Sequence, residues 1–169
     1  MKKNSKIAFG SLGGIVIFLF IAYLGAWLIA PGSYARAEAY VFDIPEDSLL
    51  TIIYEVKSEN PELDLTKKVN IPNGQFFDLK DGRRDENDYW HSVYFYYPDK
   101  NEILHTWTRP KTKNSTTFAF VGINSGLTLE KWRTINESFW WWKNKPDKEE
   151  FEDRILKKIK EKTKAQHGI

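Results

Sequence analysis

The sequence predicts an α+β domain that follows an N-terminal transmembrane helix. Three observations support this prediction. Residues 7–30 carry no charged side chain, two blocks at 42–61 and 146–162 show helical periodicity, and runs of strand periodicity separated by turn residues lie between these blocks. We therefore expect, in chain order, a membrane span, a helix, an antiparallel meander of about four strands and a C-terminal helix.

Composition limits the possible functions. The 169 residues are 41% hydrophobic and 28% charged, as in an ordinary globular domain, and seven Trp supply large rings for a core. The absence of cysteine excludes disulfides, thiolate metal sites and a cysteine nucleophile. A net charge of +2 gives no overall field that would attract a polyanion, so we expect no nucleic-acid partner.

The uncharged N-terminal stretch is long enough to cross a lipid bilayer. A helix over residues 7–30 would exceed a hydrocarbon core of about 30 Å. Lys2, Lys3 and Lys6 precede the stretch and only Arg36 follows closely, which places the N-terminus in the cytoplasm. The predicted organisation is that of a single-pass membrane protein with a signal anchor and a periplasmic or extracellular domain: cytoplasmic 1–6, transmembrane 7–30, tether 31–39, exported domain 40–164 and frayed end 165–169.

Two features near this stretch leave alternatives open. Ala35-Arg36-Ala37 and Ala37-Glu38-Ala39 have the small-x-small form of signal-peptidase sites, so a cleaved signal peptide competes with an uncleaved anchor. Gly10 and Gly14 form a GxxxG pair that would let two helices pack closely as a homodimer. The competing explanation is that glycine is simply common in membrane spans.

Helical spacing predicts one helix on each side of the strands. The first has apolar residues at i, i+3, i+4 and i+7, with Pro45 suited to its first turn and Asn60-Pro61 to its end. Asp147 with Glu150 resembles a capping box at the start of the second helix. The residues that define the two apolar faces are Leu49, Ile52, Ile53 and Val56 in the first helix and Phe151, Ile155 and Ile159 in the second.

Four runs between the helices have strand character. Turn residues separate them, of which "PDKN" at 98–101 and "PKTKN" at 110–114 are the clearest. The pattern of residues 127–135 fits either a strand or a helix. The four predicted strands are Gln75 to Leu79, Tyr89 to Tyr97, Glu102 to Arg109 and Ser115 to Ile123.

The "PDKN" hairpin predicts an aromatic site. If Tyr97 lies opposite Glu102, the two-residue period places one set of rings and cations on a single face, where they could bind a sugar or a peptide aromatic. The alternative is that these rings form the core that both helices cover. His91 falls on the opposite face and His167 in the frayed end, so we expect no metal site. The candidate binding residues are Trp90, Tyr94, His105, Trp107 and Arg109.

Two further segments are candidate sites. In the charged loop at 81–88, Asp85 and Asp88 could perform acid and base chemistry, although neighbouring opposite charges are also typical of a solvated loop. Trp140, Trp141 and Trp142 are consecutive, so they cannot all point into one core. They suit docking at a membrane interface or to a partner protein, and the alternative is partial burial beneath the C-terminal helix.

Three blocks of the sequence resemble a known kind of protein. They are "FDIPEDSLLTIIYEVKSENP", "DLKDGRRDENDYWHSVYFYYPDKNEILHTWTRP" and "TTFAFVGINSGLTLEKW". These blocks look like those of small, uncharacterised envelope proteins of Bacteroidetes-type bacteria that are anchored by one span or by a lipid. The resemblance implies an envelope location and no catalytic residues. Because this chain lacks cysteine, the lipid-anchored variant does not apply.

The functional expectation is a membrane-anchored, non-enzymatic module that binds a protein or envelope partner outside the cytoplasm. An immunity or protective factor is one example of this class. We expect no cofactor and no catalytic residue. The alternatives are an envelope hydrolase that uses Asp85, Asp88 or His105, and a structural subunit of a membrane complex that assembles through the GxxxG pair and the tryptophans.

Overall fold

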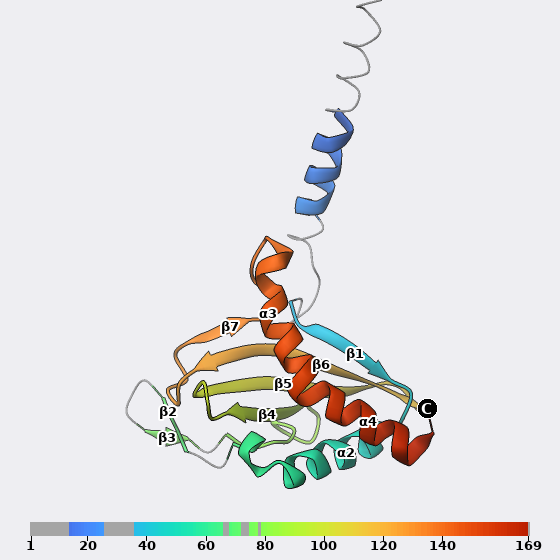
Figure 1. Ribbon diagram of the computed structural model, residues 1–169, viewed down its shortest axis with the longest axis vertical. Coiled ribbons are helices and arrows are strands. Elements are labelled where there is room, and N and C mark those ends of the chain that lie inside the picture. The colour runs from blue at the N-terminus through green and yellow to red at the C-terminus, as the bar shows by residue number, and fades with distance from the viewer. Residues whose placement is uncertain (1–13, 26–35, 66–67, 72–74, 78, 169) are drawn as a thin grey trace, which may run out of the picture. The chain divides into compact units, whose positions relative to one another are not determined.

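The computed structural model describes residues 14–25, 36–65, 68–71, 75–77 and 79–168 (Figure 1). The chain divides into two compact units, Met1–Ala35 and Arg36–Ile169. In the first unit, residues 14–25 are helical.

The predicted membrane span is wrong. Among the residues that the structure describes, no helix is both long and apolar enough to cross a bilayer. The predictions of a transmembrane helix at 7–30, a signal anchor and a single-pass localisation with a periplasmic or extracellular domain therefore fail. Gly10 of the GxxxG pair lies outside the described residues, and the space around Gly14 is open.

The second unit is an α+β domain built on one antiparallel sheet of five strands. The central strand β6 pairs with β5 on one side, and β5 pairs in turn with β4. On the other side of β6, β1 and β7 lie end to end, because β1 pairs with residues 116–120 and β7 with residues 122–124. The strands are β1 (Glu38–Phe42), β4 (His91–Tyr97), β5 (Glu102–Thr112), β6 (Ser115–Ser125) and β7 (Trp132–Thr134).

The predicted meander corresponds to β4, β5 and β6, and the ambiguous segment 127–135 contains the strand β7. Strand β1 was not predicted, and its first two residues belong to the predicted tether 31–39. Two short strands, β2 (Val69–Asn70) and β3 (Phe76–Phe77), form a separate small sheet. The predicted strand Gln75 to Leu79 therefore corresponds to β3 and does not belong to the meander, which has three strands. A 3-10 turn at Pro61–Leu63 follows the first helix.

Both predicted helices are present. Helix α2 (Glu46–Glu59) begins after Pro45 and ends at Asn60, as its sequence signals indicate. The C-terminal helix comprises α3 (Trp141–Phe151), a π-helical turn (Glu152–Leu156) and α4 (Lys157–His167). It starts earlier than predicted, with Pro146 inside its first turns. The predicted capping box is wrong, because Asp147 lies within α3 and forms an ion pair with Arg133.

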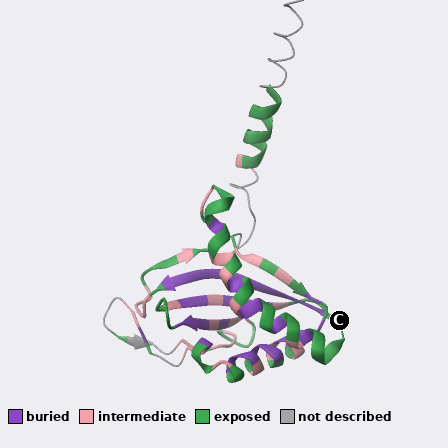
Figure 2. Cartoon of the chain, in the orientation of Figure 1, coloured by how far each residue is buried: buried purple, intermediate pink, exposed green. Residues whose placement is uncertain are grey.

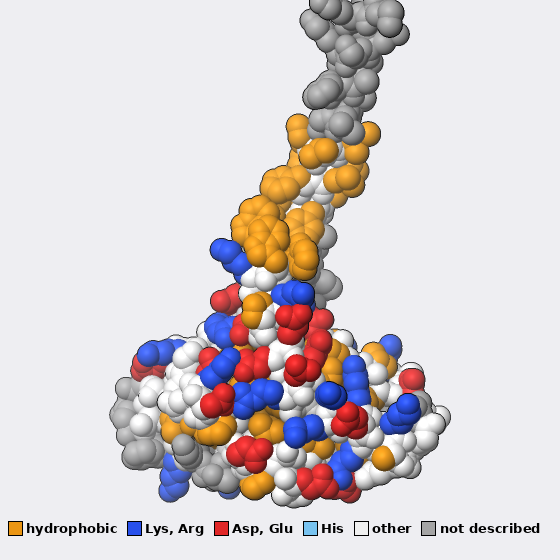
Figure 3. Space-filling model, in the orientation of Figure 1, with side chains coloured by type: hydrophobic (Ala, Val, Ile, Leu, Met, Phe, Trp, Pro, Cys, Tyr) orange, Lys and Arg blue, Asp and Glu red, His pale blue; other side chains and the backbone are white. Residues whose placement is uncertain are grey.

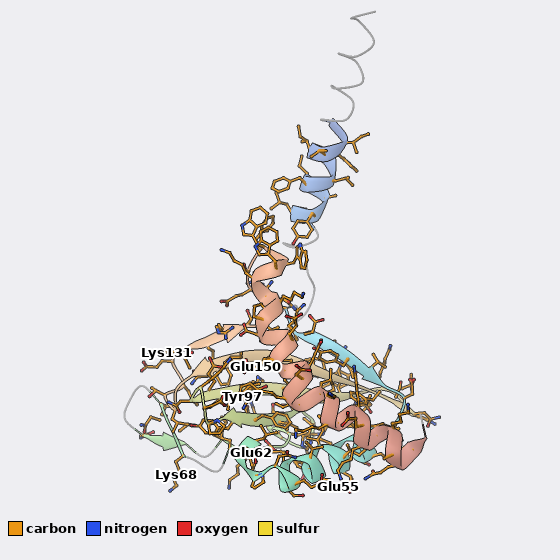
Figure 4. The ribbon with its side chains drawn as sticks, viewed as in Figure 1. Glu55, Glu62, Lys68, Tyr97, Lys131 and Glu150 are labelled. Carbon is orange, nitrogen blue, oxygen red and sulfur yellow. The ribbon has the colours of Figure 1, made fainter. Side chains whose placement is uncertain are left out.

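The helices cover one face of the sheet and bury the main core between them (Figures 1 and 2). Phe151 stacks on Phe120 of β6 with ring centres 4.3 Å apart. Arg154 lies over the Tyr97 ring at 3.8 Å and also pairs with Glu150 at 3.1 Å; Tyr97 and Glu150 are labelled in Figure 4. Outward-facing charges of both signs mix over the helices (Figure 3), as expected for a solvated surface.

A bulge in β6 keeps the core residues on the helix side. His105 pairs with Gly122 and Thr106 with Phe120, so Val121 is an extra residue in β6. The extra residue reverses the alternation, and Phe120 and Ile123 therefore face the same core despite their odd spacing.

Gly122 is predicted to be required for the pairing of β6 with β7. A Cβ atom at this position would lie 2.6 Å from the backbone oxygen of Arg133. Gly122→Ala should therefore lower the free energy of unfolding by about 2 kcal/mol, because β7 has to shift. Urea unfolding of the full chain measures this. The control is Gly14→Ala, where an added Cβ meets no atom within 4 Å; equal stabilities of the two variants would contradict the prediction.

Candidate functional site

The hairpin register predicted from "PDKN" is confirmed. Tyr97 pairs with Glu102, Tyr94 with His105 and Ser92 with Trp107. Tyr94, His105, Trp107 and Arg109 therefore lie on one face of β4 and β5. Trp90 precedes β4, and its ring reaches Trp107 with 6.4 Å between ring centres.

The alternative that these rings form the core under the helices is wrong, although part of the set is buried: Trp107 is 5% exposed, and Tyr94 packs against a second cluster of Val69, Tyr96 and Ile103. The strand residues that pack under the helices are Val93, Phe95, Tyr97 and Leu104, which have the opposite parity. The candidate residues thus occupy the face of the sheet that is turned away from the helices. We define this aromatic face as Tyr89, Trp90, Tyr94, His105, Trp107, Arg109 and Trp132.

The aromatic face consists of two groups of interlocked rings. In the first, Tyr89 contacts Trp90 edge to face at 5.4 Å, and the Arg109 guanidinium lies 5.3 Å from the Trp107 ring centre and 5.4 Å from that of Tyr89. In the second, Tyr94 stacks on His105 at 5.0 Å. Trp132 of β7 meets His105 edge to face at 6.0 Å. The sequence did not predict Trp132 as a site residue, because the segment 127–135 fitted either a strand or a helix. It did not predict Tyr89 either, because the contact of this ring with Arg109 depends on the fold before β4.

Exposure increases from the centre of this face to its two ends. Trp107 is 5% exposed, whereas Tyr89 is 53% and Trp132 is 41% exposed. Rings that are held by neighbours and still reach solvent are available for contact with a ligand.

Electrostatics distinguishes the histidine from the arginines. Burial, together with the nearby charge of Arg84, lowers the pKa of His105 to about 4, so its ring is neutral at pH 7. The His105 Nε2 atom is hydrogen-bonded to Ser92 Oγ at 3.2 Å. In the part of the chain that the structure describes, neither Arg84 nor Arg109 has a carboxylate partner.

The two candidate carboxylates of the charged loop accept hydrogen bonds from the backbone of the loop. Asp85 accepts a hydrogen bond from the backbone N–H of Asn87, and Asp88 accepts one from the backbone N–H of Trp90. These are turn-forming bonds of the loop itself. No group of three or more metal-ligating side chains occurs among the described residues.

A groove beside α2 was not predicted. It has a volume of about 310 Å³ and is lined by Tyr54, Lys57, Ser58, Pro61, Asp64 and Asp81. The buried Lys57 ammonium pairs with Asp81 at 2.5 Å and with Asp64 at 2.6 Å. Asp81 also accepts the backbone N–H of Tyr94 at 2.8 Å, so Lys57 holds two segments against the edge of β4. The available signal was a lysine four residues after Ile53 on the apolar stripe of the helix.

The three consecutive tryptophans start the C-terminal helix. Trp140, Trp141 and Trp142 are 46%, 66% and 50% exposed, and the first and third stack at 4.9 Å. The rings lie at the start of this helix rather than beneath it, and each is about half exposed.

Comparison with known proteins assigns no function. No family model matches the chain, and no curated protein or solved structure is significantly similar to it. The resemblance to envelope proteins of Bacteroidetes-type bacteria stays a prediction, and the function of the site is inferred from its own residues.

The ion pairs of Lys57 with Asp64 and Asp81 are predicted to stabilise the domain strongly. Lys57→Met removes the cation and leaves Asp81 beside Asp64 without it, which should cost about 3 kcal/mol of unfolding free energy. The matched control is Lys145→Met, which breaks an exposed pair with Glu149 and should cost less than about 0.5 kcal/mol. Denaturant unfolding at pH 7 compares them. A Lys57→Met protein as stable as the wild type would show that these ion pairs do not stabilise the fold.

The neutral His105 predicts a pH dependence of stability. The unfolded chain binds a proton on this ring near pH 6.5, whereas the folded protein does so only near pH 4. The unfolding free energy should therefore fall as the pH drops through this interval, and His105 adds no pH dependence above it. Between pH 7 and pH 4.5 the wild type should lose about 2 kcal/mol more than His105→Gln. Parallel urea titrations test this, and identical losses would refute it; the shift of His91 is common to both proteins.

Proposed function

We propose that this protein is a non-catalytic module that binds a polypeptide partner on the aromatic face of its sheet. The observation that carries the proposal is a row of Trp, Tyr and Arg side chains on rigid strands, on the face that the helices do not cover. Trp, Tyr and Arg are the residue types enriched at the centres of protein interfaces.

The geometry favours binding over catalysis. His105 is neutral at pH 7 and is hydrogen-bonded to a serine, while Asp85 and Asp88 accept hydrogen bonds from the loop backbone. A proton-transfer site needs a group whose pKa lies near the working pH. The hydrolase alternative therefore has no supporting geometry among these residues.

The ring contacts fix the aromatic face before any partner arrives. Tyr94 is stacked on His105, and Arg109 lies over two rings. Side chains that are already held lose little rotamer freedom on binding, so more of the contact energy contributes to affinity. An immunity or protective role, the absence of a nucleic-acid partner and homodimer formation stay predictions.

A displayed random-peptide library tests the proposal. Panning on the full-length protein should enrich peptides that bind the wild type and lose at least tenfold in affinity for Trp132→Ala or Tyr89→Ala. Both rings are exposed, so their removal should leave the melting temperature nearly unchanged. Trp142→Ala removes an exposed ring outside the aromatic face and serves as the matched control, with less than a twofold loss. Failure to enrich any peptide, or equal binding to all variants, would overturn the proposal.

A further inference from the structure

The charge state of the aromatic face indicates what kind of polypeptide it binds; this inference rests on the proposed function. Three other arginines of the domain are paired with carboxylates: Arg83 with Glu46, Arg133 with Asp147 and Arg154 with Asp99. Arg109 differs, because no carboxylate of the described chain pairs with it. Its guanidinium is instead held by the rings of Tyr89 and Trp107.

Contact with aromatic rings uses the flat surfaces of a guanidinium. The N–H groups at its edge stay available as donors, and their fork geometry matches the two oxygens of a carboxylate. Arg109 is therefore a positioned cation for which the described residues supply no carboxylate acceptor. The exposed Tyr89 ring lies directly beside it.

Neighbouring charges support an anionic ligand. Arg84 is close enough to lower the pKa of His105, and no carboxylate of the described chain pairs with it either. Lys111 and Lys113 follow Arg109 in the β5–β6 hairpin, are exposed and also lack a carboxylate partner in this part of the structure. Since the His105 ring is neutral, Arg84 and Arg109 are the cations that the described contacts place beside these rings.

The same region does not suit a nucleic-acid strand. Asp85 and Glu86 are exposed in the loop that carries Arg84, so the cations do not form a continuous track. A phosphate backbone requires such a track, with several contacts along its length. A single carboxylate beside a flat apolar group needs only one oriented cation and one ring.

We propose that the aromatic face selects polypeptide segments in which an acidic side chain lies next to an aromatic or aliphatic one. The carboxylate binds the N–H edge of Arg109, and the apolar neighbour packs on Tyr89. This selection by charge complementarity gives orientation as well as affinity, because Arg109 and Tyr89 are fixed relative to each other.

The peptides enriched by panning test this selection. Most of them should contain Asp or Glu beside an apolar residue. Changing the Asp to Asn, or the Glu to Gln, should weaken binding at least tenfold. Arg109→Gln should weaken the acidic peptide tenfold and leave the neutral peptide within twofold. Arg109→Lys keeps the charge but loses the two parallel N–H donors of the guanidinium. Its affinity for the acidic peptide should lie between those of the wild type and Arg109→Gln. Circular dichroism establishes that each variant is folded.

The outcomes separate the two proposals. Peptides that need Tyr89 and Trp132 but show no acidic preference would overturn the carboxylate selection and keep the binding function. Equal binding of the acidic peptide by wild type and Arg109→Gln would do the same. An oligothymidine probe that competes fully with the acidic peptide, and binds more tightly, would assign the surface to phosphate and overturn both. Absence of any enriched peptide would remove both.

Discussion

The stacking of Phe151 on Phe120 determines which face of the sheet is covered. Phe151 ends α3 and also lies 5.9 Å from the Phe118 ring, so the C-terminal helix is fixed over the middle of β6. Helix α2 buries Leu49 and Ile53 in the same core. One sheet has only two faces, and both helices pack on one of them. A second, smaller cluster around Val69, Tyr96 and Ile103 buries part of the other face, where Tyr89 and Trp132 stay exposed. The aromatic face therefore depends on contacts made on the opposite side of the sheet.

Local features of the chain were predictable because their signals lie close together. The four-residue turn at 98–101 and the two-residue period set the pairing of Tyr94 with His105. The helical spacing that ends at Val56 likewise identified α2. The choice of covered face was not predictable from these signals, since both faces of β4 carry large rings. It depends on the bulge at Val121 and on distant packing partners.

Features that join distant segments were missed. Strand β1 pairs with β6 across more than seventy positions of sequence, and its five residues carry too little alternation to be recognised alone. The ion pair between Lys57 and Asp81 likewise joins a helix to a loop. The membrane span failed for a different reason: an uncharged stretch reports side-chain type, whereas a span also requires helix length. Among the residues that the structure describes, no helix is long and apolar enough to cross a bilayer.

The two basic residue types on the aromatic face have different physical roles. His105 loses its charge because burial removes water from a ring whose protonation is weakly favourable. Arg109 keeps its charge, since a guanidinium cannot release its proton in a protein. The rings that surround Arg109 compensate part of its lost hydration through their π faces. The same aromatic environment therefore keeps the His105 ring neutral and orients the Arg109 guanidinium. The result is a fixed cation among apolar rings. Such a surface presents a defined shape and a fixed positive charge together.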